Sequence, residues 1–208
     1  MLKQWTIGLF LSLILSTQAM AQLAFNEGVD YKLINPAVKT TNPDKVVVTE
    51  LFWYGCPHCF RFEPYVERWS ADLPDTVVFE QIPSIINPRW ADHARTFYSL
   101  ELMNKQEELH SKIFDAIHIK RQRIDRLDSI ATFVAAQGVD EAKFRETFNS
   151  FSVDALLRKN FKKEEKYGHN GVPTVVVNGK YLTSGSMAGS NERLIQVINF
   201  LVGMELSQ

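Results

Sequence analysis

The two cysteines limit what this chain can fold into more than any other feature, because they are its only cysteines and lie three residues apart, in Cys56-Pro57-His58-Cys59. Two cysteines placed at random would show this spacing about one time in a hundred. A bridge between them cannot join distant segments, so it is not the framework of a small disulfide-rich domain. The spacing instead predicts a pair placed together for chemistry.

The N-terminus has the three parts of a secretory signal peptide: Lys3, the apolar run 7–15 and the small-residue pattern Ala19-Met20-Ala21. A membrane anchor is the weaker interpretation, because the apolar run is shorter than the ~20 residues that span a bilayer core. No cysteine follows the expected cleavage site, so no lipid attachment point is present there. We expect a signal peptide over residues 1–21, cleaved after Ala21, and a soluble exported protein that starts at Gln22.

The composition is that of a globular protein, with 45% hydrophobic and 23% charged residues. The formal net charge of −1 becomes −2 when Lys3 is lost with the leader. Such a balance lacks the basic surface that nucleic acid requires, so we expect no nucleic-acid partner. The length that remains after the leader fits one domain, or one domain with an insertion.

The residues around the cysteines predict a strand, a helix and a second strand. Residues 46–54 form a continuous β-branched and aromatic run, which is typical of a central strand buried on both faces. Pro57 fits the first turn of a helix that reaches about residue 73, and Pro64 within it predicts a kink. Residues 77–82 predict the second strand. The cysteines then lie at the carboxyl end of the first strand, where open α/β sheets place their sites.

The middle of the chain, residues 90–167, has helical periodicity and no good strand, so we expect an all-helical insertion. The expected helix starts are the N-caps Asp125, Asp140 and Ser152, and Gly138 is expected to end a helix. The four histidines other than His58 are expected on helix surfaces without a function: His93, His110, His118 and His169.

The pattern returns to β after the insertion. Asn178-Gly179 separates two β-rich runs within residues 171–182, which is a strong hairpin signal, and a helix from about Ser190 to Leu201 closes the chain. The whole order describes an α/β thioredoxin fold with an all-helical insertion between its βαβ half and its C-terminal hairpin-helix half. The expected domains are residues 22–89 with 168–208 for the thioredoxin-like domain, and 90–167 for the helical insertion domain.

Two motifs carry a family resemblance: Glu50-Leu51-Phe52-Trp53-Tyr54-Gly55-Cys56-Pro57-His58-Cys59-Phe60 and Gly171-Val172-Pro173-Thr174. With a helical block between them and a signal peptide before them, the chain resembles the DsbA family of bacterial periplasmic thiol:disulfide interchange proteins, within the thioredoxin superfamily, over nearly all of residues 22–208. The central Pro57-His58 pair is specific, because these two positions differ between reductases, isomerases and oxidases. The resemblance implies a disulfide oxidase that acts on newly exported proteins in the periplasm.

The resemblance also implies a role for each motif residue. Cys56 would be the attacking thiol of the Cys-Pro-His-Cys site that Pro57 completes, Cys59 the resolving thiol and His58 the thiolate stabiliser. Val172-Pro173 would be the cis-proline substrate loop, and Glu50 matches the family's buried acidic residue. No cofactor is implied besides the redox-active disulfide Cys56-Cys59. The implied partners are reduced unfolded secreted polypeptides and a quinone-linked membrane reoxidase of the DsbB kind, and a monomer is the default.

The chemistry of the residues themselves supports these roles. Cys56 at a helix N-terminus would meet free backbone N–H groups and the positive end of the helix dipole, which lower a thiol pKa, and His58 could add a hydrogen bond or a charge. Because a disulfide carries no charge, stabilising the thiolate makes the disulfide a stronger oxidant. Glu50 leaves two interpretations: a proton acceptor for Cys59, or a strand face that is wet. Pro173 could simply begin a strand, but we expect a cis peptide bond.

Three other functions remain possible on the sequence. A disulfide isomerase or reductase is the nearest, although only about 25 residues separate the leader from the first strong strand, too few for the extra N-terminal domain of dimeric isomerases. A metal-binding module is less favoured, since Cys56, His58 and Cys59 are short of the four ligands of structural zinc, and we expect no metal. A non-redox chaperone would rest on Trp53, Tyr54 and Phe62, aromatics that are more often core. Transfer of a disulfide to a reduced unfolded substrate separates these functions.

Overall fold

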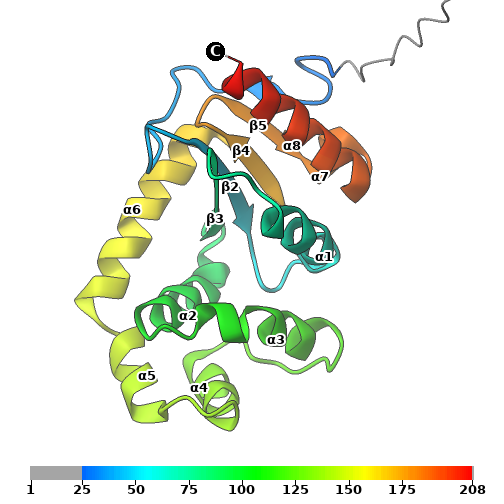
Figure 1. Ribbon diagram of the computed structural model, residues 1–208. Coiled ribbons are helices and arrows are strands. Elements are labelled where there is room, and N and C mark those ends of the chain that lie inside the picture. The colour runs from blue at the N-terminus through cyan, green and yellow to red at the C-terminus, as the bar shows by residue number, and fades with distance from the viewer. Residues whose placement is uncertain (1–24, 208) are drawn as a thin grey trace, which may run out of the picture.

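The computed structural model describes residues 25–207 (Figure 1), so the expected signal peptide and its cleavage site lie outside the described residues. The strands are β1 (Lys32–Leu33), β2 (Val46–Phe52), β3 (Val77–Pro83), β4 (Thr174–Val177) and β5 (Tyr181–Ser184). The helices are α1 (Pro57–Ala71), α2 (Ala91–Leu102), α3 (Gln106–His118), α4 (Leu127–Ala136), α5 (Glu141–Phe148), α6 (Phe151–Tyr167), α7 (Gly185–Ala188) and α8 (Asn191–Leu206), with a 3-10 turn η1 (Pro88–Trp90) before α2.

The strands form one mixed sheet in the order β1-β5-β4-β2-β3, in which β2 pairs parallel with β3 and antiparallel with β4. Every residue of β2 is buried, which confirms the predicted central strand covered on both faces. Val46 and Val48 lie on the face of the sheet that α1 and α8 cover, whereas Leu51 packs with Tyr167 of α6 on the opposite face. The alternation follows from the two-residue period of a strand and sends Glu50 to the same side as Val48.

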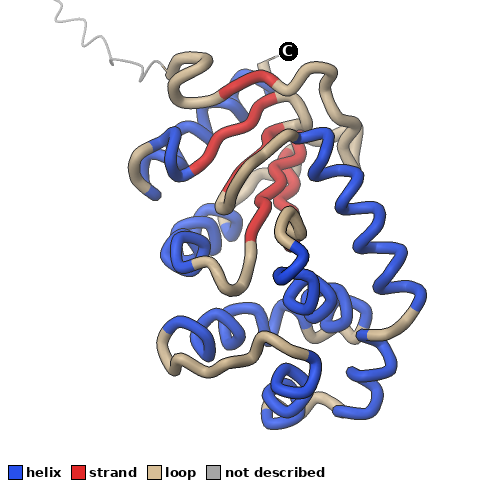
Figure 2. Tube along the Cα trace, turned by 180° about the vertical axis from the view of Figure 1, so that it is seen from behind, coloured by secondary structure: helices blue, strands red, loops and turns tan. Residues whose placement is uncertain are grey.

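The helical part lies between β3 and β4 in the chain, as predicted, and occupies one half of the molecule (Figure 2). Its core residues Leu109, Ile113 and Phe114 belong to one cluster with Phe52 and Cys59. The insertion therefore packs on the carboxyl end of β2, where the cysteines are. In Figure 2 the long helix α6 runs from the helical part back to the sheet.

Two of the expected helix caps are wrong. Helix α4 begins after Arg126 and not at Asp125, because the Ser129 hydroxyl accepts from the Arg126 N–H and starts the helix one residue later. Helix α6 is capped by Ser150, whose hydroxyl accepts from Val153 N, so Ser152 lies inside the first turn. The other two signals are confirmed: Asp140 caps α5 by accepting from Lys143 N, and Gly138 has φ +88° just after α4.

The predicted hairpin and closing helix are confirmed. Asn178 and Gly179 between β4 and β5 both have positive φ, 49° and 65°. A Cβ at position 179 would lie 1.9 Å from the Val38 carbonyl oxygen, so only glycine fits there. Ser190 caps α8, which continues to Leu206 and not only to Leu201. The short elements β1 and α7 were not predicted, because two and four residues carry too little periodicity to recognise.

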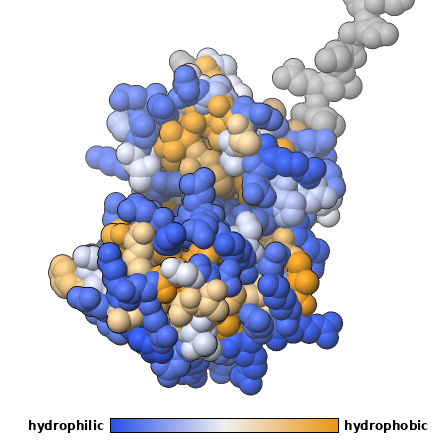
Figure 3. Space-filling model, turned by 60° about the horizontal axis from the view of Figure 1, so that its bottom comes forward, coloured by the Kyte–Doolittle hydropathy of each residue, from blue (hydrophilic) through white to orange (hydrophobic). Residues whose placement is uncertain are grey.

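The surface of the helical part is mostly hydrophilic, with small hydrophobic patches (Figure 3). Exposed apolar residues there include Leu102, Ile119 and Phe151. Among the described residues, no helix combines the length and the apolar character that crossing a membrane requires.

Candidate functional site

The two cysteines lie at the beginning of α1, which follows β2 after a short loop (Figure 1). Cys56 is the N-cap residue, and its Sγ accepts a hydrogen bond from the Cys59 N–H over 3.4 Å. Pro57 follows as the first helical residue, where no N–H is needed. Both cysteines are thiols in this structure and both are buried, with 6% of Cys56 and none of Cys59 exposed. The difference leaves Cys56 as the sulfur at the mouth of the site.

The surroundings of the two sulfurs drive their pKa values apart. A hydrogen bond from the Cys59 side chain, opposed by burial and helped by the backbone N–H groups of Cys59 and His58, lowers the pKa of Cys56 from 9.0 to about 6. Burial, followed by the hydrogen bond and charge of Cys56, raises the pKa of Cys59 well above 9.0. One sulfur is therefore a thiolate near neutral pH while the other holds its proton.

The His58 side chain contributes less to this than its position suggested. Its charge is the smallest of the named influences on the pKa of Cys56, after its own backbone N–H. The ring is exposed, and its Nδ1 lies 3.0 Å from Arg61 Nη2, with which it forms a hydrogen bond. The helix N-terminus and the partner thiol stabilise the thiolate more than the imidazole does.

The Val172-Pro173 peptide bond is cis, as predicted, and lies beside the cysteines. The Cys56 thiol donates to the Val172 carbonyl oxygen over 3.5 Å. A groove of about 340 Å³ opens next to this contact, and it is lined by His58, residues 170–174, residues 184–186 and residues 189–191. Two segments more than a hundred positions apart in the chain thus form one site.

Glu50 is fully buried in β2, so the interpretation of a wet strand face is wrong. Its Oε2 accepts from Gln81 Nε2 over 2.9 Å, from the directly opposite position of β3, while its Oε1 has no hydrogen-bond partner. Burial, together with the nearby charge of Glu63, raises the pKa of Glu50 to about 8. The carboxyl group is therefore protonated and neutral at pH 7, and when it ionises its charge interacts with both cysteine sulfurs.

Comparison with known protein families identifies the chain. The profile of the DSBA-like thioredoxin domain matches residues 47–194, which is most of the sequence. The chain belongs to the DsbA family. It is 37% identical over 181 residues to the thiol:disulfide interchange protein DsbA of Pseudomonas aeruginosa, a match that covers 87% of this chain and 86% of that protein.

Other relatives of this DsbA-family protein agree. The DsbA of Azotobacter vinelandii is 37% identical over 86% of this chain and 84% of its own. The crystal structure of Pseudomonas aeruginosa DsbA superimposes with a TM-score of 0.84 at 37% identity and covers 88% of this chain and 95% of that one. The fold is thus the thioredoxin-like DsbA fold, and the protein is a thiol:disulfide oxidoreductase.

Three histidines around the DsbA-type site contradict the expectation of solvated helix surfaces. His93 and His110 are 7% and 5% exposed, and His169 is 9% exposed and lies in a loop. His110 contacts the Tyr54 hydroxyl at 2.9 Å and Glu63 Oε1 at 3.1 Å. Buried imidazoles are tolerated here because each ring has at least one nitrogen paired with a protein group. The spacing of His110 with Ile113 and Phe114 on the apolar face of α3 was the signal that could have revealed its burial.

The aromatic residues of the motif are mostly core, as predicted. Tyr54 and Phe62 are fully buried, whereas Trp53 is partly exposed and stacks on Trp90 with ring centres 4.6 Å apart. A Cβ at Gly55 would come within 2.2 Å of the Trp53 ring, so a larger residue there would displace the ring. His118 was also missed: its Nε2 lies 2.7 Å from the Tyr54 carbonyl oxygen and its ring stacks on Phe60.

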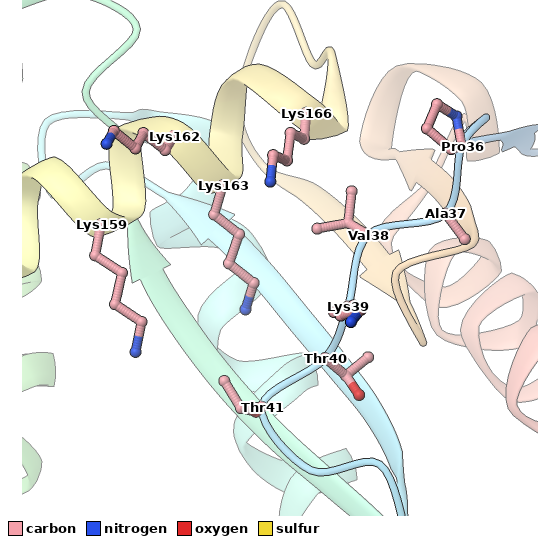
Figure 4. A pocket seen from close by; sticks show the side chains of 10 residues that line it. All are labelled: Pro36, Ala37, Val38, Lys39, Thr40, Thr41, Lys159, Lys162, Lys163 and Lys166. Carbon is pink, nitrogen blue, oxygen red and sulfur yellow. The ribbon is translucent and has the colours of Figure 1, made fainter.

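Another cavity of the DsbA-family protein lies away from the cysteines, beside α6 (Figure 4). It has about 690 Å³ and is lined by residues 36–41 and by four lysines of α6, namely Lys159, Lys162, Lys163 and Lys166. Val38 in its wall bonds to Gly179 at the tip of the β4-β5 hairpin, and this tip lies beside the beginning of β2. Cys56 follows the other end of β2, so this cavity takes no part in the thiol chemistry. Among the described residues, no group of three or more histidine, cysteine or acidic side chains is placed to hold a metal ion.

Proposed function

We propose that this protein donates its disulfide to newly exported polypeptides through Cys56, with Cys59 as the resolving thiol. The observation that carries the proposal is the split between the two sulfurs, with the pKa of Cys56 lowered to about 6 and that of Cys59 raised well above 9. The lower-pKa sulfur leaves more readily from a mixed disulfide and is the better stabilised anion. The reduced protein is then favoured, and the disulfide is an oxidant.

The exchange proceeds in two displacements. A substrate thiolate attacks the sulfur of Cys56, the bond between Cys56 and Cys59 breaks as the mixed disulfide forms, and Cys59 departs with the electron pair. A second substrate thiolate then attacks the substrate sulfur of the mixed disulfide, and Cys56 departs as a thiolate. The substrate loses two electrons to the protein and gains a disulfide. Because Cys59 has the high pKa, its departure requires a proton.

Glu50 is the proposed source of that proton. With a pKa of about 8 it is protonated at neutral pH, and it interacts electrostatically with both sulfurs. In the reverse direction, when the dithiol is reoxidised, the same carboxylate accepts the proton from Cys59. The unpaired Oε1 leaves one position of the carboxyl group open for this exchange.

Val172-Pro173 is the proposed substrate loop. An extended polypeptide could pair with the backbone of Val172 as an added strand, which would place its cysteine at Cys56. The 3.5 Å contact between the Cys56 sulfur and the Val172 oxygen supports this role, as does the adjoining groove. Pro57 begins α1 and His58 lines the groove, so their proposed parts are to start the helix and to adjust the thiolate and the substrate contact.

The remaining proposals concern the cellular setting. We infer export to the periplasm with cleavage of the leader after Ala21, supported by the sequence of residues 1–21. DsbA-family membership implies substrate proteins and a membrane reoxidase, and we propose a quinone-linked reoxidase of the DsbB kind. We also propose a monomer that needs no cofactor besides its disulfide. Its proposed insertion domain covers residues 90–167, and the thioredoxin-like domain covers the residues on either side.

The decisive experiment mixes the oxidised protein with a reduced, unfolded polypeptide and measures free thiols in both. Loss of substrate thiols matched by the appearance of two protein thiols is the expected result. The roles of the sulfurs are read separately by alkylating the reduced protein across pH: Cys56 should be modified with a midpoint near pH 6, and Cys59 only in strong alkali or after unfolding. Equal alkylation of both cysteines near neutral pH would contradict the assignment, and an absence of transfer would favour a disulfide isomerase or reductase over a disulfide donor.

A further inference from the structure

His169 lies in the loop between α6 and β4, and its side chain is almost fully enclosed, with 1% of the side-chain surface accessible. Its Nε2 lies 3.1 Å from Oε2 of Glu164, which is equally buried, and its Nδ1 lies 3.0 Å from the Gly171 carbonyl oxygen. Gly171 immediately precedes Val172 and the cis bond. One ring therefore spans the distance between α6 and the loop beside Cys56.

The chemistry of the partners fixes how the ring is used. A carbonyl oxygen can only accept, so Nδ1 carries a proton and donates it to Gly171. At the other nitrogen one proton lies between Nε2 and the Glu164 carboxyl group, whichever of the two groups owns it. Both ends of the imidazole are thus engaged in hydrogen bonds inside the protein, where an unpaired polar atom would be costly.

Glu164 extends the connection to the end of β3. Its carboxyl group accepts from the Ser84 hydroxyl over 2.9 Å and from the Ile85 backbone N–H over 3.1 Å. The Ser84 backbone N–H in turn donates to the Phe52 carbonyl oxygen over 2.7 Å, at the last residue of β2. A continuous series of hydrogen bonds thus joins the loop to the strand that leads into Cys56.

We propose that His169 is a positioning residue, which through Glu164 holds the Gly171 carbonyl and so sets the Val172 backbone at a fixed place relative to Cys56. The Thr174 hydroxyl also donates to the Gly171 oxygen, over 2.7 Å, but Thr174 begins β4 directly after the loop, so this bond does not tie the loop to α6. The proposal rests on the proposed role of Val172 in binding extended substrates. A substrate that pairs with the loop needs this placement, whereas a small thiol needs only the sulfur.

The test uses two variants that each keep one half of the bridge. His169→Gln retains a donor toward Glu164 but loses the hydrogen bond to Gly171. His169→Asn retains a donor toward Gly171 but loses the hydrogen bond to Glu164. Each oxidised variant is reacted with a synthetic extended peptide containing one cysteine and, separately, with reduced glutathione. The rate constant for the peptide should fall about threefold to tenfold, the value of one hydrogen bond, while the rate constant for glutathione and the pKa of Cys56 stay as in the unchanged protein.

The control is Arg95→Gln, which removes a comparable tie from α2 to two other helices, through the Phe148 carbonyl at the end of α5 and Asp154 in the first turn of α6. It should cost stability and leave the ratio of peptide to glutathione rates unchanged. A ratio unchanged in a folded His169 variant, or equally lowered in Arg95→Gln, would overturn the assignment, and if one His169 variant does not fold the other still decides. Failure of the unchanged protein to oxidise the peptide at all would instead refute the proposed function.

Discussion

At the scale of single residues, identical side chains acquire different chemistry from their surroundings. Cys56 and Cys59 lie one helical turn apart, yet Cys56 is the N-cap whose sulfur receives the Cys59 N–H at the helix end, while Cys59 is fully enclosed. Glu50 shows the same principle among the acids. Its counterpart Glu80, on β3, is partly exposed and bonded to Lys163 and Thr49, and these bonds outweigh burial and lower its pKa, whereas burial raises the pKa of Glu50.

Glu50→Gln should therefore change the pH dependence of stability. The pKa of Glu50 in the folded protein, about 8, is above the ordinary value of 4.5, so its contribution to stability is fully present below 4.5 and is lost as pH rises through 8. Glutamine does not ionise. The free energy of unfolding of the variant should therefore rise relative to that of the unchanged protein between pH 5 and 8, by at most ~1.4 kcal/mol per pH unit. Urea unfolding of the reduced proteins across this range measures the gain.

Glu80→Gln is the matched control for this measurement, with the opposite sign. Because the folded pKa of Glu80 is lowered, its stabilisation is present at neutral pH and disappears in acid. The control variant should therefore be less stable than the unchanged protein at pH 7 and approach it in acid. If the free energy of unfolding changed with pH in the same way for Glu50→Gln and for the unchanged protein, Glu50 would not be protonated in the folded protein.

At the scale of elements, helix α6 places like charges together. Lys159, Lys162, Lys163 and Lys166 occur at helical spacing along it, and Figure 4 shows them around the cavity that faces residues 36–41. Lys163 is paired with Glu80 and lies over the Tyr167 ring. Lys162 lies four residues from both Arg158 and Lys166, an arrangement that destabilises a helix.

Lys162→Glu should stabilise the protein. The new carboxylate would face Arg158 and Lys166, at i−4 and i+4, and would replace two repulsive pairs by two attractive ones, for a gain of about 0.5–1 kcal/mol. Thermal unfolding at low ionic strength measures this as an increase of Tm by about 1–4 °C. Lys162→Gln should give roughly half the increase, and 1 M salt should abolish most of it because the charges are exposed. A gain that salt does not reduce would have another origin.

At the scale of the whole molecule, the site exists because two parts of the chain meet at the end of β2. The sheet supplies the strand that leads to Cys56, the helical part covers Cys59 from the other side, and α6 returns the chain so that Val172 lies against Cys56. The redox state of the pair therefore acts on the stability of the entire fold. Two effects compete: the disulfide constrains the unfolded chain, and the folded protein stabilises the thiolate.

The stability order of the two redox forms should reverse with pH. A bridge that closes a four-residue loop contributes only ~2 kcal/mol. Folding lowers the pKa of Cys56 from 9.0 to about 6. The stability that the Cys56 thiolate adds to the reduced form is therefore fully present above pH 9 and is lost as pH falls through 6, at about 1.4 kcal/mol per pH unit. The oxidised form should be the more stable below pH 7 and the reduced form above pH 8. Unfolding of both forms across this range locates the crossing.

His58→Ser provides the comparison for this prediction. Its backbone N–H is retained and the charge that it removes has the smallest influence on the pKa of Cys56, so the crossing should move only slightly to higher pH. A crossing that disappears in His58→Ser would give the imidazole the main role. An oxidised form that stays the more stable up to pH 9 would refute thiolate stabilisation as the origin of the oxidising power.

The sequence by itself determined the elements of the site: the buried strand before Cys56, the helix that begins with Pro57, the cis bond at Pro173 and the turn at Asn178-Gly179. The strand, the helix and the turn depend on interactions among a few neighbouring residues, such as side-chain periodicity, a missing N–H or a positive φ, whereas the cis bond was expected from the family resemblance. Local signals also misled, as at Ser152. Ser150 and Ser152 could each cap helix α6, and the structure uses Ser150, with Val153 buried in the first turn.

Only the tertiary structure decided the environments. His169 is enclosed beside Glu164, and the protonation of Glu50 depends on its burial and on the charge of Glu63, an arrangement that no local pattern can bring together. The modest influence of the His58 ring is likewise a result of where it points, toward Arg61. Solvation and hydrogen bonding of a polar group are set by whichever distant segments enclose it, and these are defined only when the chain is folded.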